Sequence, residues 1–250
     1  MNTQKQVKLT TATRGRRVLS MTIAAFCAAA AVPSMAADCY WAGGTSSDWG
    51  TVANWTTGNK VPDNDGAYFR SDKFNNNFKS GNRAYLVTFD AAHTNNWRTY
   101  FNNCGTASAP IILRGSNASC GLTSGDSTSN KDTALEGIYI GTNQTGGNSG
   151  TTDSKASTGD AYLRFETGTF STGPTGKYSY FFLGNNTYAG HMTVAGATIN
   201  ALNDFKIYSG DLTIESGTVY VTYWMRFENT SKAKAINLNG GTLHTYRINK

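Results

Sequence analysis

The stretch LTIESGTV at residues 212–219 decides the fold, because its pattern occurs four times in the second half of the chain. The other copies lie at residues 163–170, 192–199 and 236–243. When the copies are aligned on their Thr, apolar residues occupy the same three positions and a polar residue separates the first two. The copies return every 20 to 29 residues, which is typical of a solenoid whose turns stack on one another.

Strand alternation gives this repeat a physical meaning. Leu212 and Ile214 point to one face of a strand and Thr213 to the other. Stacked copies, about 4.8 Å apart, pair their backbones and bury one apolar wall. Burial of each Leu, Ile or Phe side chain contributes roughly 1.5–3 kcal/mol to the stability of the fold. The third apolar position lies five residues after the second, so the corner at Ser216-Gly217 must break the alternation. A second face is predicted by the apolar pairs before the copies: Ile138 and Ile140, Phe181 and Leu183, Phe205 and Ile207, Met225 and Phe227.

The first half of the chain carries short β-rich runs at residues 67–69, 85–89 and 110–113, bounded by Gly, Asn or Asp. No stretch after residue 36 sustains a period of 3.6, so we expect very little helix. Trp41, Trp49 and Trp55 predict an apolar cap over the first turn, because the open end of a solenoid must be covered. The alternative is that these Trp, with nearby Asp, bind sugar.

The first 36 residues predict a secretory signal peptide. They contain five basic residues and no acid, then an apolar run over residues 18–32, and small residues at Ser34 and Ala36. A membrane anchor is the alternative, but the run is shorter than the roughly 20 residues that a spanning helix needs. The whole chain carries +6, and the remainder after residue 36 has 17 basic and 16 acidic residues. The charge therefore gives no argument for nucleic acid or an anionic membrane as a partner.

Export permits disulfides, and residues 37–250 contain Cys39, Cys104 and Cys120. Cys104 and Cys120 are the closer pair and the predicted bridge, with Cys39 left free, while the alternative is that none pairs. No Cys-x-x-Cys or His-x-x-x-His spacing indicates a zinc site. We predict no catalytic residue, no cofactor and no metal.

Several residues carry a weaker functional hypothesis. Tyr220, Tyr223, Trp224 and Tyr246 predict an exposed aromatic strip suited to stacking on sugar rings, and the alternative is that some of them pack a corner. Lys206 and Arg226 follow the first apolar position of their strands and suggest a basic stripe, but a solvated face of mixed sign explains them better. The run Asp63-Asn64-Asp65 has half the ligands of a calcium loop, but a turn explains it better. The insertion at residues 141–160 predicts a loop on the binding face.

The sequence also resembles a known family. WAGG at 41–44, DW at 48–49, ANW at 53–55 and VP at 61–62 look like the opening of large secreted bacterial surface proteins. LGNN at 183–186, followed by residues 193–199 and 236–243, resembles the autotransporter-associated β-strand repeats of such proteins. The resemblance implies a right-handed parallel β-helix at a bacterial cell surface, and it implies no catalytic residue because the repeat is structural. The family's C-terminal transmembrane domain is not in this sequence, so we expect either a truncated chain or a last turn that pairs with something else.

These observations give one overall prediction. Residues 1–36 are a signal peptide, 37–135 a cap with the first β-helix turns, and 136–250 the β-helix repeats. The protein is expected to be exported, extracellular or on the outer surface of a bacterium, and to be structural or adhesive without catalysis. The alternative is a carbohydrate-active or glycan-binding β-helix of the polysaccharide lyase or hydrolase type. Expected partners are surface glycans or proteins, or a second copy at the C-terminal edge.

Overall fold

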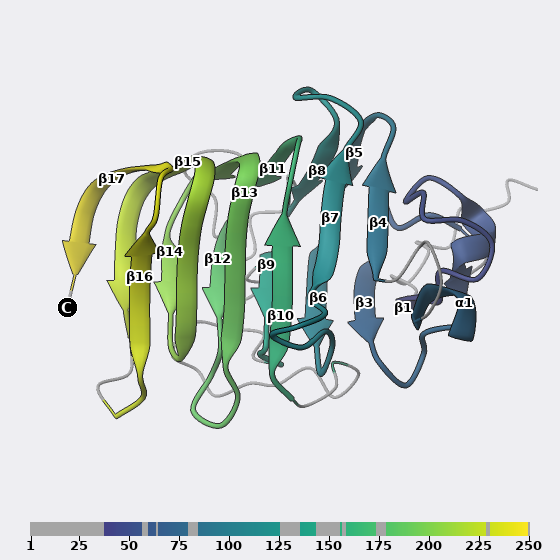
Figure 1. The fold of residues 1–250 in the computed structure, drawn as a ribbon, viewed down its shortest axis with the longest axis horizontal. Helices are drawn as coiled ribbons and strands as arrows, with labels where there is room; N and C mark the ends of the chain where they lie inside the picture. Colours follow the sequence, from purple (N-terminus) through teal and green to yellow (C-terminus); the bar gives the residue numbers. More distant parts are fainter. Residues whose placement is uncertain are drawn as a thin grey trace, which may run out of the picture. The chain divides into compact units, whose positions relative to one another are not determined.

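The described part of the chain is all-β, with one long, mostly parallel sheet that does not close (Figure 1). The computed structural model describes residues 38–56, 60–63, 65–79, 85–125, 136–143, 156, 159–173, 179–228 and 231–249. All of them belong to the unit Met35–Lys250. The predicted signal peptide at residues 1–36 lies outside them, as does most of the insertion at 141–160. No helix among the described residues is long and apolar enough to cross a membrane.

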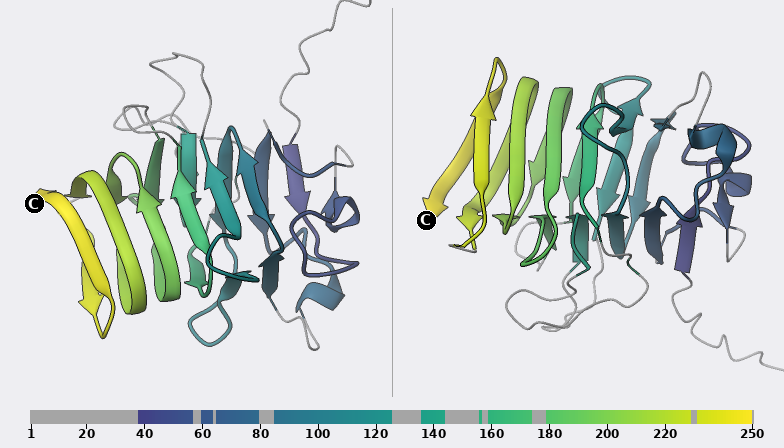
Figure 2. Two further views of the ribbon diagram at one scale, coloured as in Figure 1. Left: turned by 90° about the horizontal axis from the view of Figure 1, so that it is seen from above. Right: turned by 60° about the horizontal axis from the view of Figure 1, so that its bottom comes forward.

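The strands form three ladders, each built by strands from successive turns of the chain (Figure 2). Ladder A contains β4 (Leu86–Phe89), β7 (Ile111–Gly115), β10 (Ala161–Phe165), the starts of β13 (Gly190–Ala201) and β15 (Gly210–Phe227), and β16 (Lys234–Leu238). Ladder B contains β5 (Ala92–Asn95), β8 (Gly121–Ser124), β11 (Thr169–Thr172), later parts of β13 and β15, and the start of β17 (Thr242–Asn249). Ladder C contains β1 (Asp38–Trp41), β3 (Gly66–Arg70), β6 (Arg98–Asn102), β9 (Glu136–Ile140), β12 (Ser179–Leu183), β14 (Phe205–Ile207) and the ends of β15 and β17.

The register confirms the alignment of the four repeats. In ladder A, Leu163 pairs with Met192, Met192 with Leu212 and Leu212 with Ile236, all in parallel. The second apolar face is confirmed as well, since Phe181 pairs with Ile138 on one side and Phe205 on the other. Strand pairing is therefore set by the apolar positions, because a slip of one residue would turn every such side chain to solvent.

The corner between ladders A and B breaks the alternation, as the odd offset predicts. The pairing of β13 with β15 shifts register around Ala195. Gly196 and Gly217 occupy this corner with φ of +113° and +85°, a region that residues with a Cβ rarely adopt. Their conformation turns the next apolar residues inward, so that Ile199 and Val219 are fully buried.

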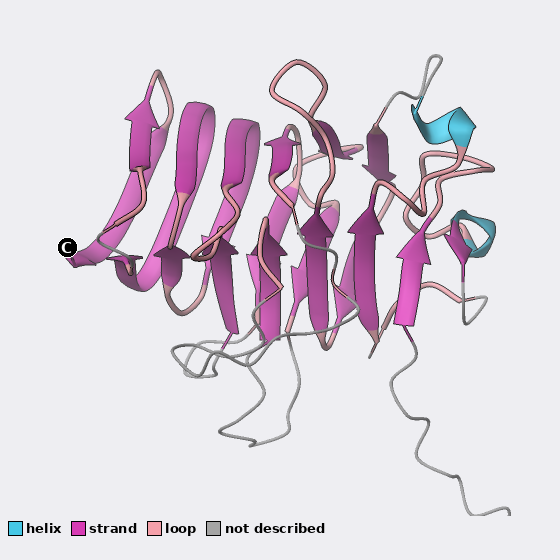
Figure 3. Ribbon diagram, turned by 90° about the horizontal axis from the view of Figure 1, so that it is seen from below, coloured by secondary structure: helices cyan, strands magenta, loops and turns pink. Residues whose placement is uncertain are grey.

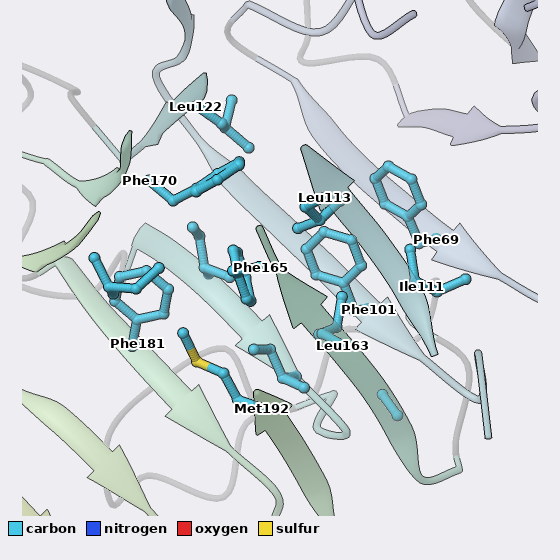
Figure 4. Packing of buried hydrophobic residues seen from close by; sticks show 14 of the residues in the cluster. Phe69, Phe101, Ile111, Leu113, Leu122, Leu163, Phe165, Phe170, Phe181 and Met192 are labelled. Carbon is cyan, nitrogen blue, oxygen red and sulfur yellow. The ribbon is translucent and has the colours of Figure 1, made fainter. Parts of the chain in front are cut away.

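The apolar positions of the three ladders meet in one core (Figure 4). Phe165, from ladder A, packs edge to face on Phe170, from ladder B, at a centroid distance of 5.0 Å. Phe181, from ladder C, stacks on Phe205 of the next turn at 5.4 Å. The interior is thus aromatic and aliphatic, and we expect its burial to supply most of the stability.

The N-terminal end is closed by packed Trp side chains. Trp41, Trp49 and Trp55 are at most 2% exposed, and Trp49 stacks on Phe89 of β4 at 5.3 Å. The only two helical segments of the described chain, η1 (Val52–Asn54) and α1 (Asn76–Lys79), lie at this end (Figure 3), as does β2 (Trp55–Thr56), which pairs with β1 in the antiparallel sense. The cap interpretation agrees with this burial, and the sugar-binding alternative for these three Trp is wrong because their rings are inside the core.

The last described turn is exposed. Leu238 occupies the same repeat position as buried Ile214, with which it pairs, yet it is 57% exposed. Ile248, which pairs with fully buried Met225, is 58% exposed. The expectation that the repeat copies bury their apolar wall is therefore wrong for Leu238, because such a position is buried only when other residues pack on both sides of its strand.

A second buried cluster lies on the outward face of ladder C. The outward positions of successive strands carry aromatic rings that stack in register, and we call them the aromatic column: Tyr40, Tyr68, Tyr100, Tyr139 and Phe182. Neighbouring centroids lie 4.8 to 5.3 Å apart. Lys206 follows in the next strand, with its Nζ 5.3 Å from the Phe182 ring centroid. We therefore expect this face to be held by stacking.

Tyr208, packed beside this column, makes stability sensitive to alkaline pH. Burial is the main reason that its pKa rises to about 12, from about 10 in an unfolded chain. Between these values the unfolded chain loses the Tyr208 proton and the folded chain keeps it, so stability falls by about 1.4 kcal/mol per pH unit. Below pH 10 the folded and the unfolded chain both keep the Tyr208 proton, so the full stability is present. Tyr208→Phe is expected to flatten this fall, measured by urea unfolding from pH 9 to 12, and an unchanged slope would contradict the assignment.

Candidate functional site

A groove lies on the outward side of ladder A. Two hollows of about 480 and 400 Å³ meet there, and both are lined by His191 and Asp211. We call this surface the His191 groove. Its rim is formed by residues from two connecting segments: Thr106, Ala107 and Pro110 on one side, and Lys232 and Ala233 on the other.

The centre of the groove is a row of three polar side chains from adjacent strands. Tyr162 of β10 pairs with His191 of β13, which pairs with Asp211 of β15. They face outward because their neighbours Leu163, Met192 and Leu212 fill the core. The strand ladder therefore sets their spacing, and no loop is needed to bring them together.

His191 is fixed on both sides. Its ring stacks on Tyr162 at a centroid distance of 4.2 Å, and its Nδ1 lies 2.8 Å from Oδ2 of Asp211. With Asp211 ionised, Nδ1–H donates to the carboxylate, and a neutral His191 then carries its lone pair on Nε2. The side chains of His191 and Asp211 are 26% and 33% exposed, so the pair is open to a ligand.

Two residues further along the strands, the groove carries a network of charges. Arg164 places Nη1 2.9 Å from Glu215 and Nε 3.4 Å from Glu166. Arg114 also contacts Glu166, through Nε at 2.6 Å. Each of these pairs is exposed enough for salt to screen it, so we expect the network to order the groove wall more than to stabilise the fold.

The wall is suited to hydrogen bonding with a polar ligand. Each carboxylate among the described lining residues has a partner: Asp211 binds His191, Glu215 binds Arg164, and Asp160 accepts a 2.8 Å hydrogen bond from the Ala189 N–H. The described lining thus offers paired acids, a His–Tyr ring pair and hydroxyl groups.

The predicted aromatic strip is brought together only in part. Tyr220 and Tyr246 line one hollow of about 390 Å³, where Tyr220 stacks on His244 at 4.8 Å. Trp224 lies under the guanidinium groups of Arg226 and Arg247, at 5.3 and 5.0 Å from its ring centroid. Tyr223 is 41% exposed and is not among the residues that line the hollow. Tyr220 and Tyr246 are therefore the strip residues that share a hollow, and the Arg247 guanidinium lies over the Tyr246 ring at 5.0 Å from its centroid.

The predicted Cys104–Cys120 disulfide is wrong in this structure, where Cys39, Cys104 and Cys120 are buried free thiols. Cys104 pairs with Ala161 at the start of β10, whereas the Cys120 carbonyl accepts a hydrogen bond from Thr169 N–H, beyond the end of β10. A strand of this length separates the two by more than about 10 Å, and a disulfide needs Cα atoms within about 7 Å. Closeness in sequence was misleading because a strand runs between them.

The acidic residues beside Lys206 and Arg226 decide between the two interpretations of this pair. Lys206 and Arg226 pair in adjacent strands, but Asp204 lies 2.8 Å from Arg226 Nε and Glu228 lies 3.8 Å from Lys206 Nζ. The face is therefore of mixed sign, and the basic-stripe interpretation is wrong. Burial, the main cause, lowers the pKa of Lys206 and raises that of Asp204.

In the predicted turn at 63–65, Asp65 is buried and paired with Lys60 at 2.5 Å. Its carboxylate therefore has a structural partner already. Asn64 lies outside the described residues, so the calcium-loop comparison rests on Asp63 and Asp65 alone.

The His191 groove itself was not predicted from the sequence, although a signal for it exists. His191 and Asp211 stand immediately before Met192 and Leu212, which occupy the same repeat position. The repeat alignment therefore places them side by side on the outward face. The residue immediately before the first apolar residue of each repeat is the position where such a row becomes visible.

Comparison with protein families, curated proteins and solved structures finds no significant match to this chain. The resemblance to autotransporter-associated repeats therefore remains a prediction from the sequence.

Proposed function

We propose that the chain is an exported bacterial adhesion scaffold, built as a right-handed parallel β-helix, that binds a glycan in the His191 groove without cleaving it. Support for the coil comes from three parallel ladders whose strands follow one another in sequence, A then B then C, from β4 onward. Parallel crossover connections are right-handed in nearly all proteins, which supports the hand. The basic, apolar and small-residue pattern of residues 1–36 supports export to the cell surface.

The observation that carries the glycan proposal is the row Tyr162–His191–Asp211 at the centre of the groove. It combines ring surface with fixed hydrogen-bonding groups, which is what sugars require of a binding site. The adjoining lining contributes Arg164, Thr193 and Glu215. Basic and acidic residues are balanced in the described lining, which favours a glycan without a large net charge.

A glycan array followed by calorimetry with the best oligosaccharide tests this proposal. We expect the full chain to bind at least one oligosaccharide, and Tyr162→Ala to weaken that binding by about tenfold, which is about 1.4 kcal/mol. Tyr246→Ala, which removes an exposed ring outside the groove, is the matched control and should leave the affinity unchanged. If Tyr246→Ala weakened glycan binding and Tyr162→Ala did not, the binding site would be the aromatic strip and not the groove. If the full chain bound no glycan, the proposal would be refuted.

A carbohydrate-active enzyme is the second candidate, and the His191–Asp211 pair favours it. A His held by a carboxylate through Nδ1 has the arrangement of a general base acting through Nε2. Incubating the chain with the glycan that it binds, and measuring new reducing or unsaturated ends, separates the candidates. The adhesion proposal expects no product. Product that disappears in His191→Gln would establish the enzyme.

A further inference from the structure

A second cluster of ligating side chains lies at the N-terminal end, away from the His191 groove. Asp48, Asp90 and His93 each place one oxygen or nitrogen atom within 4.8 Å of the others. They come from three segments: Asp48 from the cap, Asp90 from the corner after β4, and His93 from β5. Main-chain pairing holds these segments, since Trp49 N–H donates to the Thr88 carbonyl at 2.9 Å and Thr88 N–H to the Ser47 carbonyl at 2.7 Å.

His93 occupies an unusual place in ladder B. It pairs with Leu122, and the same inward position in the later turns is apolar: Leu122, Phe170, Ile199, Val219 and Leu243. Among the described strands of this row, only the first one, β5, carries a histidine. The ring lies beside Phe89 at a centroid distance of 6.1 Å, and its Nε2 lies 3.3 Å from Oδ1 of Asp90. The first strand of the row therefore presents a ligating nitrogen where the later strands present apolar side chains.

Asp48 is oriented toward the same place. Its Oδ1 accepts the Gly50 N–H at 3.2 Å and its Oδ2 accepts the Thr51 hydroxyl at 2.8 Å, which fixes the carboxylate and leaves lone pairs for a cation. A Cβ on Gly50 would lie 3.2 Å from Cε1 of His93 and 3.4 Å from Oδ2 of Asp48. The glycine thus keeps open the space between these two groups.

We infer that Asp48, Asp90 and His93 bind a transition-metal ion of the Zn²⁺ type, which fastens the N-terminal cap to the first turn. One imidazole and two carboxylates form a mixed nitrogen and oxygen set that suits Zn²⁺, whereas Ca²⁺ takes oxygen ligands alone. Three ligands at about 2.1 Å from Zn²⁺ lie about 3.4 Å apart in a tetrahedron, so the atoms of the cluster, now within 4.8 Å of one another, must approach by at most about 1.4 Å. Asp90, whose side chain is 74% exposed, has the freedom to make that movement. Water takes the fourth position.

Thermal unfolding of the metal-free full chain, with and without Zn²⁺, tests the site. Zn²⁺ at 100 times its Kd is expected to raise Tm by about 5–10 °C, because it binds the folded chain alone. Calorimetry should give one Zn²⁺ per chain. Ca²⁺ at the same concentration should produce no comparable rise.

Two variants make the test specific. His93→Leu places in the row the residue type that Leu122 has in the next turn, so it is expected to fold and to lose the Zn²⁺-dependent rise. Asp90→Asn, at an exposed position, should reduce Zn²⁺ affinity at least tenfold and leave the metal-free Tm unchanged. His244→Leu, a histidine on the last described turn, is the matched control and should keep the full rise. An equal rise in His93→Leu and in the unaltered chain, or no rise in the unaltered chain, would overturn the inference.

Discussion

Ile214→Ala is expected to lower the free energy of unfolding by about 2–5 kcal/mol, whereas Leu238→Ala should change it by less than about 0.5 kcal/mol. Both residues occupy the second apolar position of their repeat and pair directly in ladder A. Ile214 is fully buried between two turns, so its truncation leaves a cavity that the surrounding side chains fill only in part. Leu238 is 57% exposed, so its truncation removes little burial.

Urea unfolding followed by circular dichroism measures this difference on the full chain. The comparison is informative because the two residues occupy the same position of the repeat, have side chains of the same number of carbons, and differ in how far other residues cover them. Similar losses for both variants would mean that Leu238 is covered in solution, by a further turn, a partner or a second copy. Negligible losses for both would contradict the inward orientation of this ladder.

Tyr139→Ala is expected to cost about 3–5 kcal/mol, which makes it the second large effect. Tyr139 is fully buried in the middle of the aromatic column, with ring centroids 4.8 Å from Tyr100 and 4.9 Å from Phe182. Its removal opens a cavity and breaks two stacking contacts at once. Burial also raises the pKa of Tyr139 well above its usual value.

Two controls define the cause of that loss. Tyr139→Phe keeps the ring and removes the hydroxyl, so it should cost only about 1 kcal/mol. Tyr246→Ala truncates a Tyr that is 71% exposed and should cost less than about 0.5 kcal/mol. If Tyr139→Ala were no more costly than Tyr246→Ala in urea unfolding, the aromatic column would not contribute to stability.

The repeat pattern predicted the strand register because it carries two independent periods. Alternation within each copy separates inward from outward side chains, and the return of the copy places equivalent residues in neighbouring strands. Leu212 and Ile236 pair as the alignment predicts, and so do Phe181 and Phe205. The corner glycines Gly196 and Gly217 follow from the odd offset between apolar positions.

The aromatic column was missed for a different reason. Tyr68, Tyr100 and Tyr139 stand one position before the inward residues Phe69, Phe101 and Ile140, on the face that alternation assigns to solvent. Alternation predicts that a side chain points away from the main core, but it does not predict what covers that side chain. Aligning the three tyrosines with one another would have shown the column as a second repeat outside the first.

The sequence by itself determined the all-β class, the pairing of the repeats and the apolar interior, since these depend on periods that any stacked strand must satisfy. Only the tertiary structure decided which repeat positions are buried, that Cys104 and Cys120 lie at opposite ends of a strand, and that His191 meets Asp211. The physical reason is that burial and contact depend on the neighbours above, below and across a turn. A linear pattern specifies where a side chain points, and the neighbouring turns specify what it touches.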